Sequence, residues 1–484
     1  MIDLRKIYAY QIIPKILFLF FIINSFLYLG CTEQDISEPN STELKNVELW
    51  LTDAESEIYF EKQTDIEIKN SSEENLTILV DPSTKYQEID GFGYALTGGS
   101  AFHIAQMSAQ KRSALIRELF DYTENNIGVS YLRVSIGASD LDFEPFSYCD
   151  LPNGGTDINL ENFSLDKDRE YLIPVLKEIL SVSPNIKILG SPWSPPTWMK
   201  TNKATIGGSL RSEFYDAYAR YFVKYINEMK KEGINIDAIT IQNEPLHPGN
   251  NPSMLMTAIE QANFIKNNLG PTFRDSSIST KIIIYDHNAD RTDYPMTILN
   301  DAEARQYVDG SAFHLYGGEI NALGLLHEAH PDKNLYFTEQ WVGAGSDLRS
   351  TLKWHVWNLI IGGTRNWCKN VIEWNLAADE NHDPHTDGGC DRCLGALTIS
   401  GDDVTRNPAY YIIAHASKFV RPGSVRIEST LFDNLTNVSF LTPDGKIIVI
   451  VLNPNSTQIS FNIKIGNEVI STTLAPDAVG TYVW

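Results

Sequence analysis

The sequence predicts an α/β protein, a (β/α)8 TIM barrel with a side β-sandwich domain built from N-terminal strands and the C-terminal segment. Three observations support this fold class. Between residues 89 and 417, eight short apolar stretches alternate with longer segments of helical periodicity, which is typical of a parallel barrel. From residue 418 to residue 484, apolar residues instead alternate in strand-like stretches. Similar stretches in residues 47–88 precede the barrel.

The size and charge of the chain limit its function classes. A chain of 484 residues, 43% of them hydrophobic, can bury one large core and a smaller one. The formal net charge is −23, whereas binding to nucleic acid or to an anionic membrane surface needs clustered Lys and Arg. We therefore expect a neutral substrate and no nucleic-acid partner. We also expect a monomer.

The N-terminus has the pattern of a secretory signal peptide. In residues 1–30, three basic residues precede an apolar run that is shorter than the ~20 residues a membrane-spanning helix needs. The run ends in Leu-Gly-Cys31, which resembles a bacterial lipoprotein cleavage site. This predicts an exported protein anchored through lipid on Cys31 to a bacterial membrane, at the outer membrane or cell surface. The alternative is an ordinary signal peptide followed by an incidental cysteine. Residues 31–46 are polar and are expected to form a flexible tether.

The expected barrel strands follow one another between residues 89 and 417. Each is a short apolar run, and the eight are residues 91–95, 131–135, 186–191, 238–242, 281–285, 310–316, 334–338 and 370–374. Between them, residues 214–231 place aromatic side chains at helical spacing, and we expect these side chains to lie in the core.

The C-terminal segment predicts an antiparallel sheet. Its strand-like stretches are residues 425–428, 437–441, 446–452 and 460–465, and Pro443-Asp-Gly445 has the composition of a hairpin turn. Because this segment is too short to close a sandwich alone, we expect the strands of residues 47–88 to complete it.

Two glutamates are expected at one mouth of the barrel. Glu244, in Gln242-Asn-Glu-Pro245, follows the fourth predicted strand, and Glu339 follows the seventh. The carboxyl ends of barrel strands carry the functional side chains of this fold. A pair of carboxyl groups ~5–5.5 Å apart performs retaining glycoside hydrolysis, one as nucleophile and the other as proton donor. A single strand-end glutamate is more often structural, but this pair predicts an enzyme. We expect burial and the charge of Glu339 to raise the pKa of Glu244.

Five motifs along the chain are specific enough to indicate a family. They are KYQEIDGFG at residues 85–93, SPWSPPTWMKTN at 191–202, QNEP at 242–245, FHLY at 313–316 and EWNL at 373–376. Together they resemble glycoside hydrolase family 30, the glucosylceramidase and β-1,6-glucanase family, over a region from Leu76 to Trp484.

The resemblance implies a retaining β-glycosidase that acts by double displacement, with Glu244 as acid/base and Glu339 as nucleophile. It implies that Asn243 bonds the sugar 2-hydroxyl and that Asp140 accepts a bond from another hydroxyl. The full set of implied substrate-binding positions is Arg133, Asp140, Trp193, Asn243, His314, Tyr316 and Trp374.

Departures from the glucosylceramidase branch favour a different substrate. The chain has Thr97-Gly-Gly-Ser100 where that branch has an acidic residue, and it carries a Cys-containing loop that the branch lacks. We therefore expect a neutral β-1,6-linked glucan of the pustulan type, or its oligosaccharides. The alternatives are a glucosylceramidase-like β-glucosidase or β-xylosidase and, from another class, a non-catalytic glucan-binding surface lipoprotein.

The remaining cysteines and histidines do not predict a metal or a cofactor. Cys390 and Cys393 could form a zinc half-site, a redox motif or a disulfide, or could remain free thiols. No second CxxC pair exists, and export favours a disulfide that stiffens a loop. His382 and His385 flank a proline in a loop, and we expect no metal there.

Overall fold

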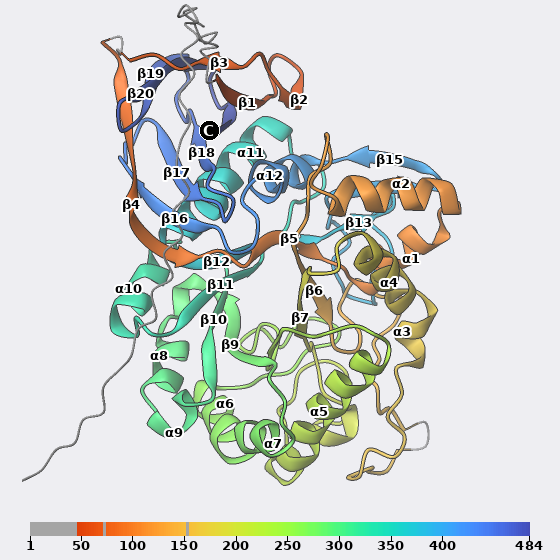
Figure 1. Ribbon diagram of the computed structural model, residues 1–484. Helices are drawn as coiled ribbons and strands as arrows, with labels where there is room; N and C mark the ends of the chain where they lie inside the picture. The colour runs from red at the N-terminus through yellow and green to blue at the C-terminus, as the bar shows by residue number, and fades with distance from the viewer. Residues whose placement is uncertain (1–45, 71–73, 152–153) are drawn as a thin grey trace, which may run out of the picture. The chain divides into compact units, whose positions relative to one another are not determined.

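The structure is a computed structural model that describes residues 46–70, 74–151 and 154–484 (Figure 1). The predicted signal peptide, the lipid-anchored Cys31 and residues 31–45 of the predicted tether lie outside the described residues. Among the described residues, no helix is both long and apolar enough to cross a bilayer.

The barrel contains all eight predicted strands, and its sheet is closed. Neighbouring strands are parallel in the order β10-β11-β12-β5-β6-β7-β8-β9. A layer of buried side chains that includes Tyr131, Ala312 and Tyr336 fills the interior, so the barrel is a packed core and not a pore. The strands are β5 (Gly91–Ala95), β6 (Tyr131–Ser135), β7 (Lys187–Ser191), β8 (Ala238–Thr240), β9 (Lys281–Asn288), β10 (Val308–His314), β11 (Asn334–Glu339) and β12 (Cys368–Asn375).

Helices connect successive barrel strands, and α12 follows the last of them and leads to the sandwich. The described α-helices are α1 (Gly98–Gln106), α2 (Ala109–Phe120), α3 (Asp166–Glu170), α4 (Leu172–Val182), α5 (Tyr215–Lys231), α6 (Ala258–Phe264), α7 (Gly270–Asp275), α8 (Asp293–Leu299), α9 (Ala302–Arg305), α10 (Ala322–Ala329), α11 (Leu348–His355) and α12 (Pro408–Ser417). Helix α5 confirms the aromatic pattern, because its buried face contains Tyr218, Tyr221, Phe222, Tyr225 and Met229.

The β-sandwich combines N-terminal and C-terminal strands, as predicted. The sheet has ten strands, in the order β2-β1-β21-β18-β17-β16-β4-β19-β20, and β3 pairs with β1. Strand β4, from the N-terminal part of the chain, lies between two C-terminal strands. It pairs antiparallel with β16 and parallel with β19. Its core includes Val47, Ile78, Val449 and Tyr482. The strands are β1 (Asn46–Asp53), β2 (Ile58–Lys62), β3 (Ile66–Glu67), β4 (Leu76–Glu88), β16 (Val425–Ser429), β17 (Thr436–Leu441), β18 (Ile447–Leu452), β19 (Ile459–Ile465), β20 (Glu468–Leu474) and β21 (Val479–Val483).

A small sheet that the sequence did not predict follows β12. It contains β13 (Ala377–Ala378), β14 (Leu397–Ser400) and β15 (Asp403–Arg406). The chain between β13 and β14 holds both Cys390 and Cys393, so this sheet anchors the two ends of the cysteine loop close to the carboxyl end of β12.

Candidate active site

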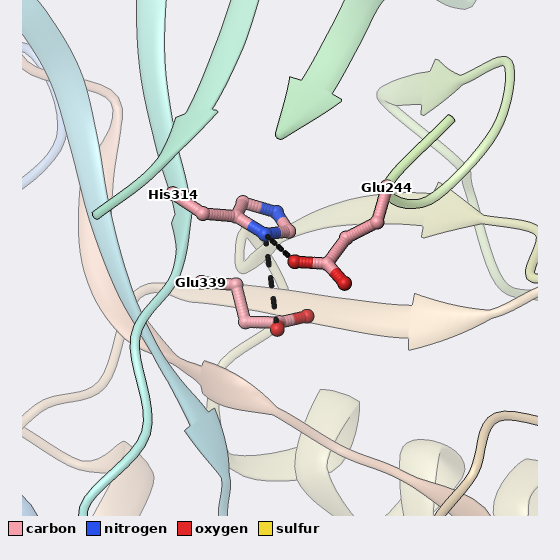
Figure 2. Close-up of side chains that lie close together, drawn as sticks. All are labelled: Glu244, His314 and Glu339. Carbon is pink, nitrogen blue, oxygen red and sulfur yellow. Dashed lines mark hydrogen bonds and ion pairs between the residues drawn. The ribbon is translucent and has the colours of Figure 1, made fainter. Parts of the chain in front are cut away.

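The two predicted glutamates face each other at the carboxyl ends of the barrel strands (Figure 2). Glu339 is the last residue of β11, and Glu244 follows β8. Glu244 has a left-handed backbone with φ of 43°, held by its N–H, which donates to the Asp286 carbonyl over 3.0 Å. One carboxylate oxygen of each glutamate and a ring nitrogen of His314 lie within 4.8 Å of one another. These facing oxygens are closer than the ~6.5–9.5 Å between the carboxyl groups of inverting enzymes, as in the retaining enzymes, whose carboxyl groups lie ~5–5.5 Å apart.

Both glutamates line a pocket of about 470 Å³. Its lining residues are Asp140, Trp193, Asn243, Glu244, His247, Asn250, His287, Asn288, Tyr316, Glu339, Trp341, Trp374, Cys390 and Cys393. A hollow of about 620 Å³ at the amino ends of the strands, beside Asp90, Lys187 and Lys281, contains no predicted site residue. Two predicted residues, Arg133 and His314, are not among the lining residues but contact residues that line the pocket.

Two donors hold the Glu339 carboxylate. Arg133 Nη1 lies 2.5 Å from Oε2, and the Tyr316 hydroxyl donates to Oε1 over 3.0 Å. Burial raises the pKa of Glu339 above its ordinary value, and the charges of His314 and Arg133 limit that rise. The two donors fix the orientation of the carboxylate and favour its ionised form.

Arg133 is fully buried and connects Glu339 to the floor of the site. Its Nη2 donates to Asp286 over 2.9 Å and to Asn243 Oδ1 over 2.6 Å. Asn243 Oδ1 accepts this hydrogen bond from Arg133, so the Asn243 amide NH2 remains to donate to a ligand in the pocket.

Asp286, which the sequence did not single out, is the centre of this polar network. It lies near the carboxyl end of β9 and is fully buried. Burial opposes its charge, but Arg133 and His314 outweigh that effect and hold the pKa of Asp286 well below its usual range. Besides these two residues, its donors are Ser191 at 2.8 Å, Thr240 at 2.7 Å and Thr338 at 2.6 Å. The available signal was the polar run Asp286-His-Asn288 at the end of the fifth predicted strand.

Imidazole groups surround the Glu244 carboxylate. His314 Nδ1 lies 3.2 Å from Oε1, and His287 Nε2 lies 3.8 Å from the same oxygen. Burial favours the neutral acid, but the hydrogen bond and charge of His314 outweigh burial and lower the pKa of Glu244. The predicted rise in this pKa is therefore wrong for the unliganded site, because the sequence alone does not place a cationic imidazole between the two glutamates.

His314 is a buried cation among three carboxylates. Its Nδ1 faces Glu244, and its Nε2 lies 3.1 Å from Asp286. Burial disfavours the charge, but Glu339 and the hydrogen-bonded carboxylates raise the pKa of His314 to about 9. The cationic form, in which both ring nitrogens carry protons, is thereby favoured. Glu244, His314 and Glu339 are also close enough together to hold a metal ion.

Aromatic rings form one wall of the pocket. The ring centroids of Trp193 and Trp374 lie 5.4 Å apart, and the Arg133 guanidinium lies 4.8 Å and 5.6 Å from them. Both tryptophans are buried and line the pocket, as does Trp341, which the sequence did not single out. Such rings offer an apolar surface to the C–H face of a sugar.

Asp140 and the two cysteines lie on another side of the pocket. Cys390 and Cys393 form the expected disulfide, and the Cys390 N–H donates to Asp140 Oδ2 over 3.3 Å. Burial and the charge of Glu339 raise the pKa of Asp140 to about 7.

Comparisons with known proteins agree with this geometry. Residues 89–420 match the glycosyl hydrolase family 30 TIM-barrel domain, and residues 423–482 match the beta sandwich domain of the same family. The chain is 35% identical over 429 residues to the endo-1,6-beta-D-glucanase of Neurospora crassa, an alignment that covers 84% of this chain and 88% of the relative. It is 30% identical to the lysosomal acid glucosylceramidase of Mus musculus, with coverage of 86% and 84%.

A solved structure of an endo-beta1,6-glucanase superimposes with a TM-score of 0.85 at 35% identity, and covers 91% of this chain and 99% of that one. The barrel, the sandwich and the paired glutamates thus occur in a sequence that matches both family domains. The chain belongs to glycoside hydrolase family 30 and is a glycoside hydrolase.

Proposed function

We propose that the protein hydrolyses β-1,6-linked glucan with retention of configuration, with Glu339 as nucleophile and Glu244 as acid/base. The observation that carries the proposal is the asymmetry of the glutamate pair. Glu339 is bound by a guanidinium and a phenol, which orient a carboxylate for attack. Glu244 is bound by imidazole groups instead.

In the first step, a Glu339 oxygen attacks the anomeric carbon while Glu244 gives its proton to the departing glycosidic oxygen. A glycosyl ester and a shortened glucan result. In the second step, Glu244 takes a proton from water, whose oxygen attacks the same carbon and releases Glu339 as a carboxylate. A sugar in the pocket displaces water from Glu244 and so raises its pKa, as the acid role requires.

Two lines of support favour a saccharide leaving group over a lipid. The Neurospora crassa relative and the superimposed structure are named as endo-β-1,6-glucanases. Beside Glu244, the pocket lining includes the polar residues His247, Asn250, His287 and Asn288. Their polar groups can bond sugar hydroxyls, whereas an apolar ceramide chain offers them no hydrogen bond.

Product analysis tests the proposed substrate. The purified protein is incubated in parallel with pustulan, laminarin, gentiobiose, xylan and glucosylceramide. We expect release of oligosaccharides from pustulan, with the β anomer formed first by proton NMR. Release from glucosylceramide or xylan alone would overturn the glucan assignment. Binding to pustulan without any release would favour the non-catalytic surface protein.

We also propose that the protein is exported and anchored to a bacterial membrane through lipid on Cys31. The Leu-Gly-Cys31 sequence after an apolar run supports this proposal. In cells that express the full chain, Cys31→Ala should move the protein from the membrane fraction to the soluble fraction, and mass spectrometry should detect acylation only in the wild type. An unmodified Cys31 in the wild type would contradict the anchor.

A further inference from the structure

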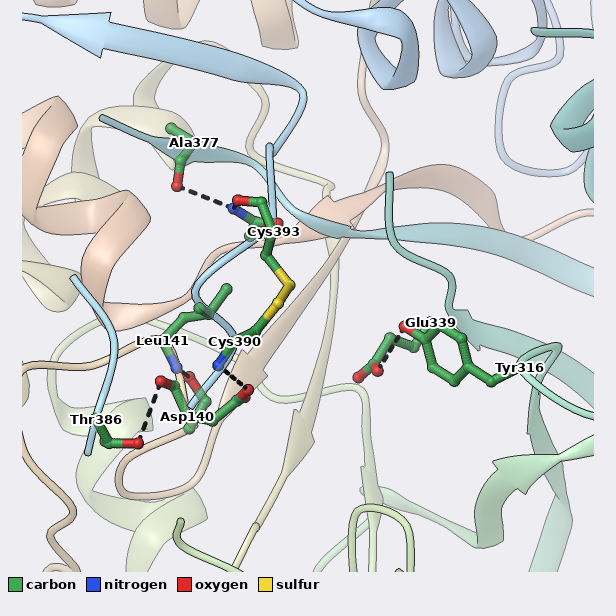
Figure 3. The surroundings of a disulfide bond; sticks show 10 residues. Asp140, Leu141, Tyr316, Glu339, Ala377, Thr386, Cys390 and Cys393 are labelled. Atoms are coloured by element: carbon green, nitrogen blue, oxygen red, sulfur yellow. Dashed lines mark hydrogen bonds between the residues drawn. A yellow bond between two sulfur atoms is a disulfide. The ribbon is translucent and has the colours of Figure 1, made fainter. Parts of the chain in front are cut away.

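Residues 384–394 form a strap that contains the Cys390–Cys393 disulfide (Figure 3). Both cysteines line the pocket with the two glutamates. Cys393 is buried in a small cluster with Trp193 and Trp374, and Cys390 packs against this cluster. The disulfide is therefore part of the pocket surface.

The strap is attached to the loops on both sides of it. Thr386 donates through its N–H to the Asp140 carbonyl over 2.9 Å and through its hydroxyl to the Asn251 carbonyl over 2.5 Å. At the other end, the Ala344 N–H donates to the Arg392 carbonyl over 2.8 Å. Between these attachments, the disulfide closes the turn Cys390-Asp-Arg-Cys393 and so fixes the position of the Cys390 N–H.

The Cys390 N–H is the link between the strap and a polar group of the pocket. It donates to Asp140 Oδ2, and among the described residues no other residue is seen to donate to this carboxylate apart from the Asp140 backbone itself. Asp140 is only 7% exposed and lines the pocket. Its orientation therefore depends on where the turn holds one backbone N–H.

We propose that the Cys390–Cys393 disulfide is a positioning element of the sugar subsite, which holds the Cys390 N–H against Asp140 so that this carboxylate accepts a hydroxyl of the bound glucosyl unit. The proposal rests on the proposed function, which supplies the glucosyl unit. Reduction frees the turn, and Asp140 then loses its fixed donor. Sugar binding then weakens. Glu339 lies at the end of β11 and Glu244 follows β8, outside the strap, so reduction leaves the positions of these two glutamates unchanged.

Steady-state kinetics on β-1,6-glucan test this proposal. The double variant Cys390→Ser/Cys393→Ser should raise KM about tenfold, the effect of weakening one hydrogen bond to a charged group, with kcat changed less than about twofold. A reductant should produce the same change in the wild type and none in the double variant. Alkylation followed by mass spectrometry measures the fraction of reduced Cys390 and Cys393.

Asp140→Asn is combined with the cysteine double variant in a double-mutant cycle. In the wild-type background we expect it to raise KM, and in the double variant to add little, because the two changes remove the same interaction. Asp391→Asn, an exposed position within the same turn, is the matched control and should leave KM unchanged.

Each further outcome decides the question. An unchanged KM after complete reduction of the wild type overturns the proposal, and this comparison does not require the double variant to fold. Additive effects of Asp140→Asn and the double variant also overturn it. If the oxidised wild type does not hydrolyse β-1,6-glucan, the proposed function fails, and the same KM comparison on the glycoside that it does hydrolyse decides the role of the disulfide.

Discussion

At the scale of single residues, the charge of His314 governs the pair of glutamates. Its imidazolium lies 3.2 Å from a Glu244 oxygen and 3.8 Å from a Glu339 oxygen. A positive charge at these distances stabilises both carboxylates in their ionised forms. The pH range of activity should therefore depend on this one side chain.

His314→Gln should move both limbs of the pH profile of kcat/KM to higher pH. Loss of the cation raises the pKa of the nucleophile, which must be ionised, and of the acid, which must be protonated. The acidic limb reports the first group and the basic limb the second, so both shift in the same direction. The measurement is kcat/KM between pH 4 and 9. Limbs that stay in place would show that His314 is neutral in the free enzyme.

Glu244→Ala and Glu339→Gln should separate the two proposed roles. Loss of the proton donor should cost about 10²–10⁴ in kcat on glucan, and much less on an aryl glucoside with a good leaving group. Azide should restore turnover of Glu244→Ala on the aryl substrate and yield a β-glucosyl azide. Glu339→Gln should lose turnover of both substrates. An α-glucosyl azide from Glu244→Ala would reverse the assignment, because azide would then have attacked the anomeric carbon in place of the nucleophile.

The sequence predicted the two glutamates but not their electrostatics. Glu244 and Glu339 could be found because each lies at the carboxyl end of an apolar stretch, residues 238–242 and 334–338. The sequence could not show that Asp286 belongs to the site, because its hydrogen-bond donors come from several different strands that meet only in the folded barrel. The lowered pKa of Glu244 depends on the same convergence, since His314 comes from another strand.

At the scale of elements, close backbone packing decides where the barrel tolerates a side chain. A Cβ on Gly93 in β5 would lie 1.8 Å from the carbonyl oxygen of Tyr131 in β6, the residue directly beside it. A backbone atom of a paired strand cannot move aside cheaply. The glycine therefore allows β5 and β6 to pair next to Arg133.

Gly93→Ala should destabilise the barrel by about 1–3 kcal/mol or more, the cost of overpacking a core. Urea unfolding measures the change. Gly249→Ala is the control, because Gly249 is exposed and its Cβ would be 3.4 Å from the nearest atom, a side-chain atom of His247. Equal stabilities of the two variants would refute this account of β5.

All eight barrel strands could be predicted, because each lies in an apolar run. The small sheet of β13, β14 and β15 could not, since its strands are short, partly exposed and set by pairing with each other. Strands β20 and β21 were also missed. Strand β21 pairs with β1, which is far away in the sequence, whereas β20 pairs with the adjacent β19 and was missed although its partner is local.

At the scale of the whole molecule, one buried histidine connects α12 to the sandwich. His415 contacts Thr481 of β21 at 2.9 Å and Thr52 of β1 at 2.8 Å, one through each ring nitrogen. Phe60 of β2 covers the ring at 5.0 Å between centroids. Burial lowers the pKa of His415 to about 3, so the folded protein holds this imidazole neutral.

Stability should fall on acidification because of His415. The ordinary pKa of His415 is 6.5. The contribution of the neutral, buried imidazole to the free energy of unfolding is therefore fully present above pH 6.5, and it is lost progressively as the pH falls toward 3. At pH 5 the loss is roughly 2 kcal/mol, since each pKa unit corresponds to about 1.4 kcal/mol. His415→Gln should be less stable than the wild type at pH 7.5, and the gap should narrow by that amount at pH 5. Carboxyl groups such as Asp140 titrate in both proteins, so their effect cancels when the two free energies of unfolding are subtracted. Urea unfolding at the two pH values measures the gap, and a gap independent of pH would mean that His415 takes up its proton in the folded state.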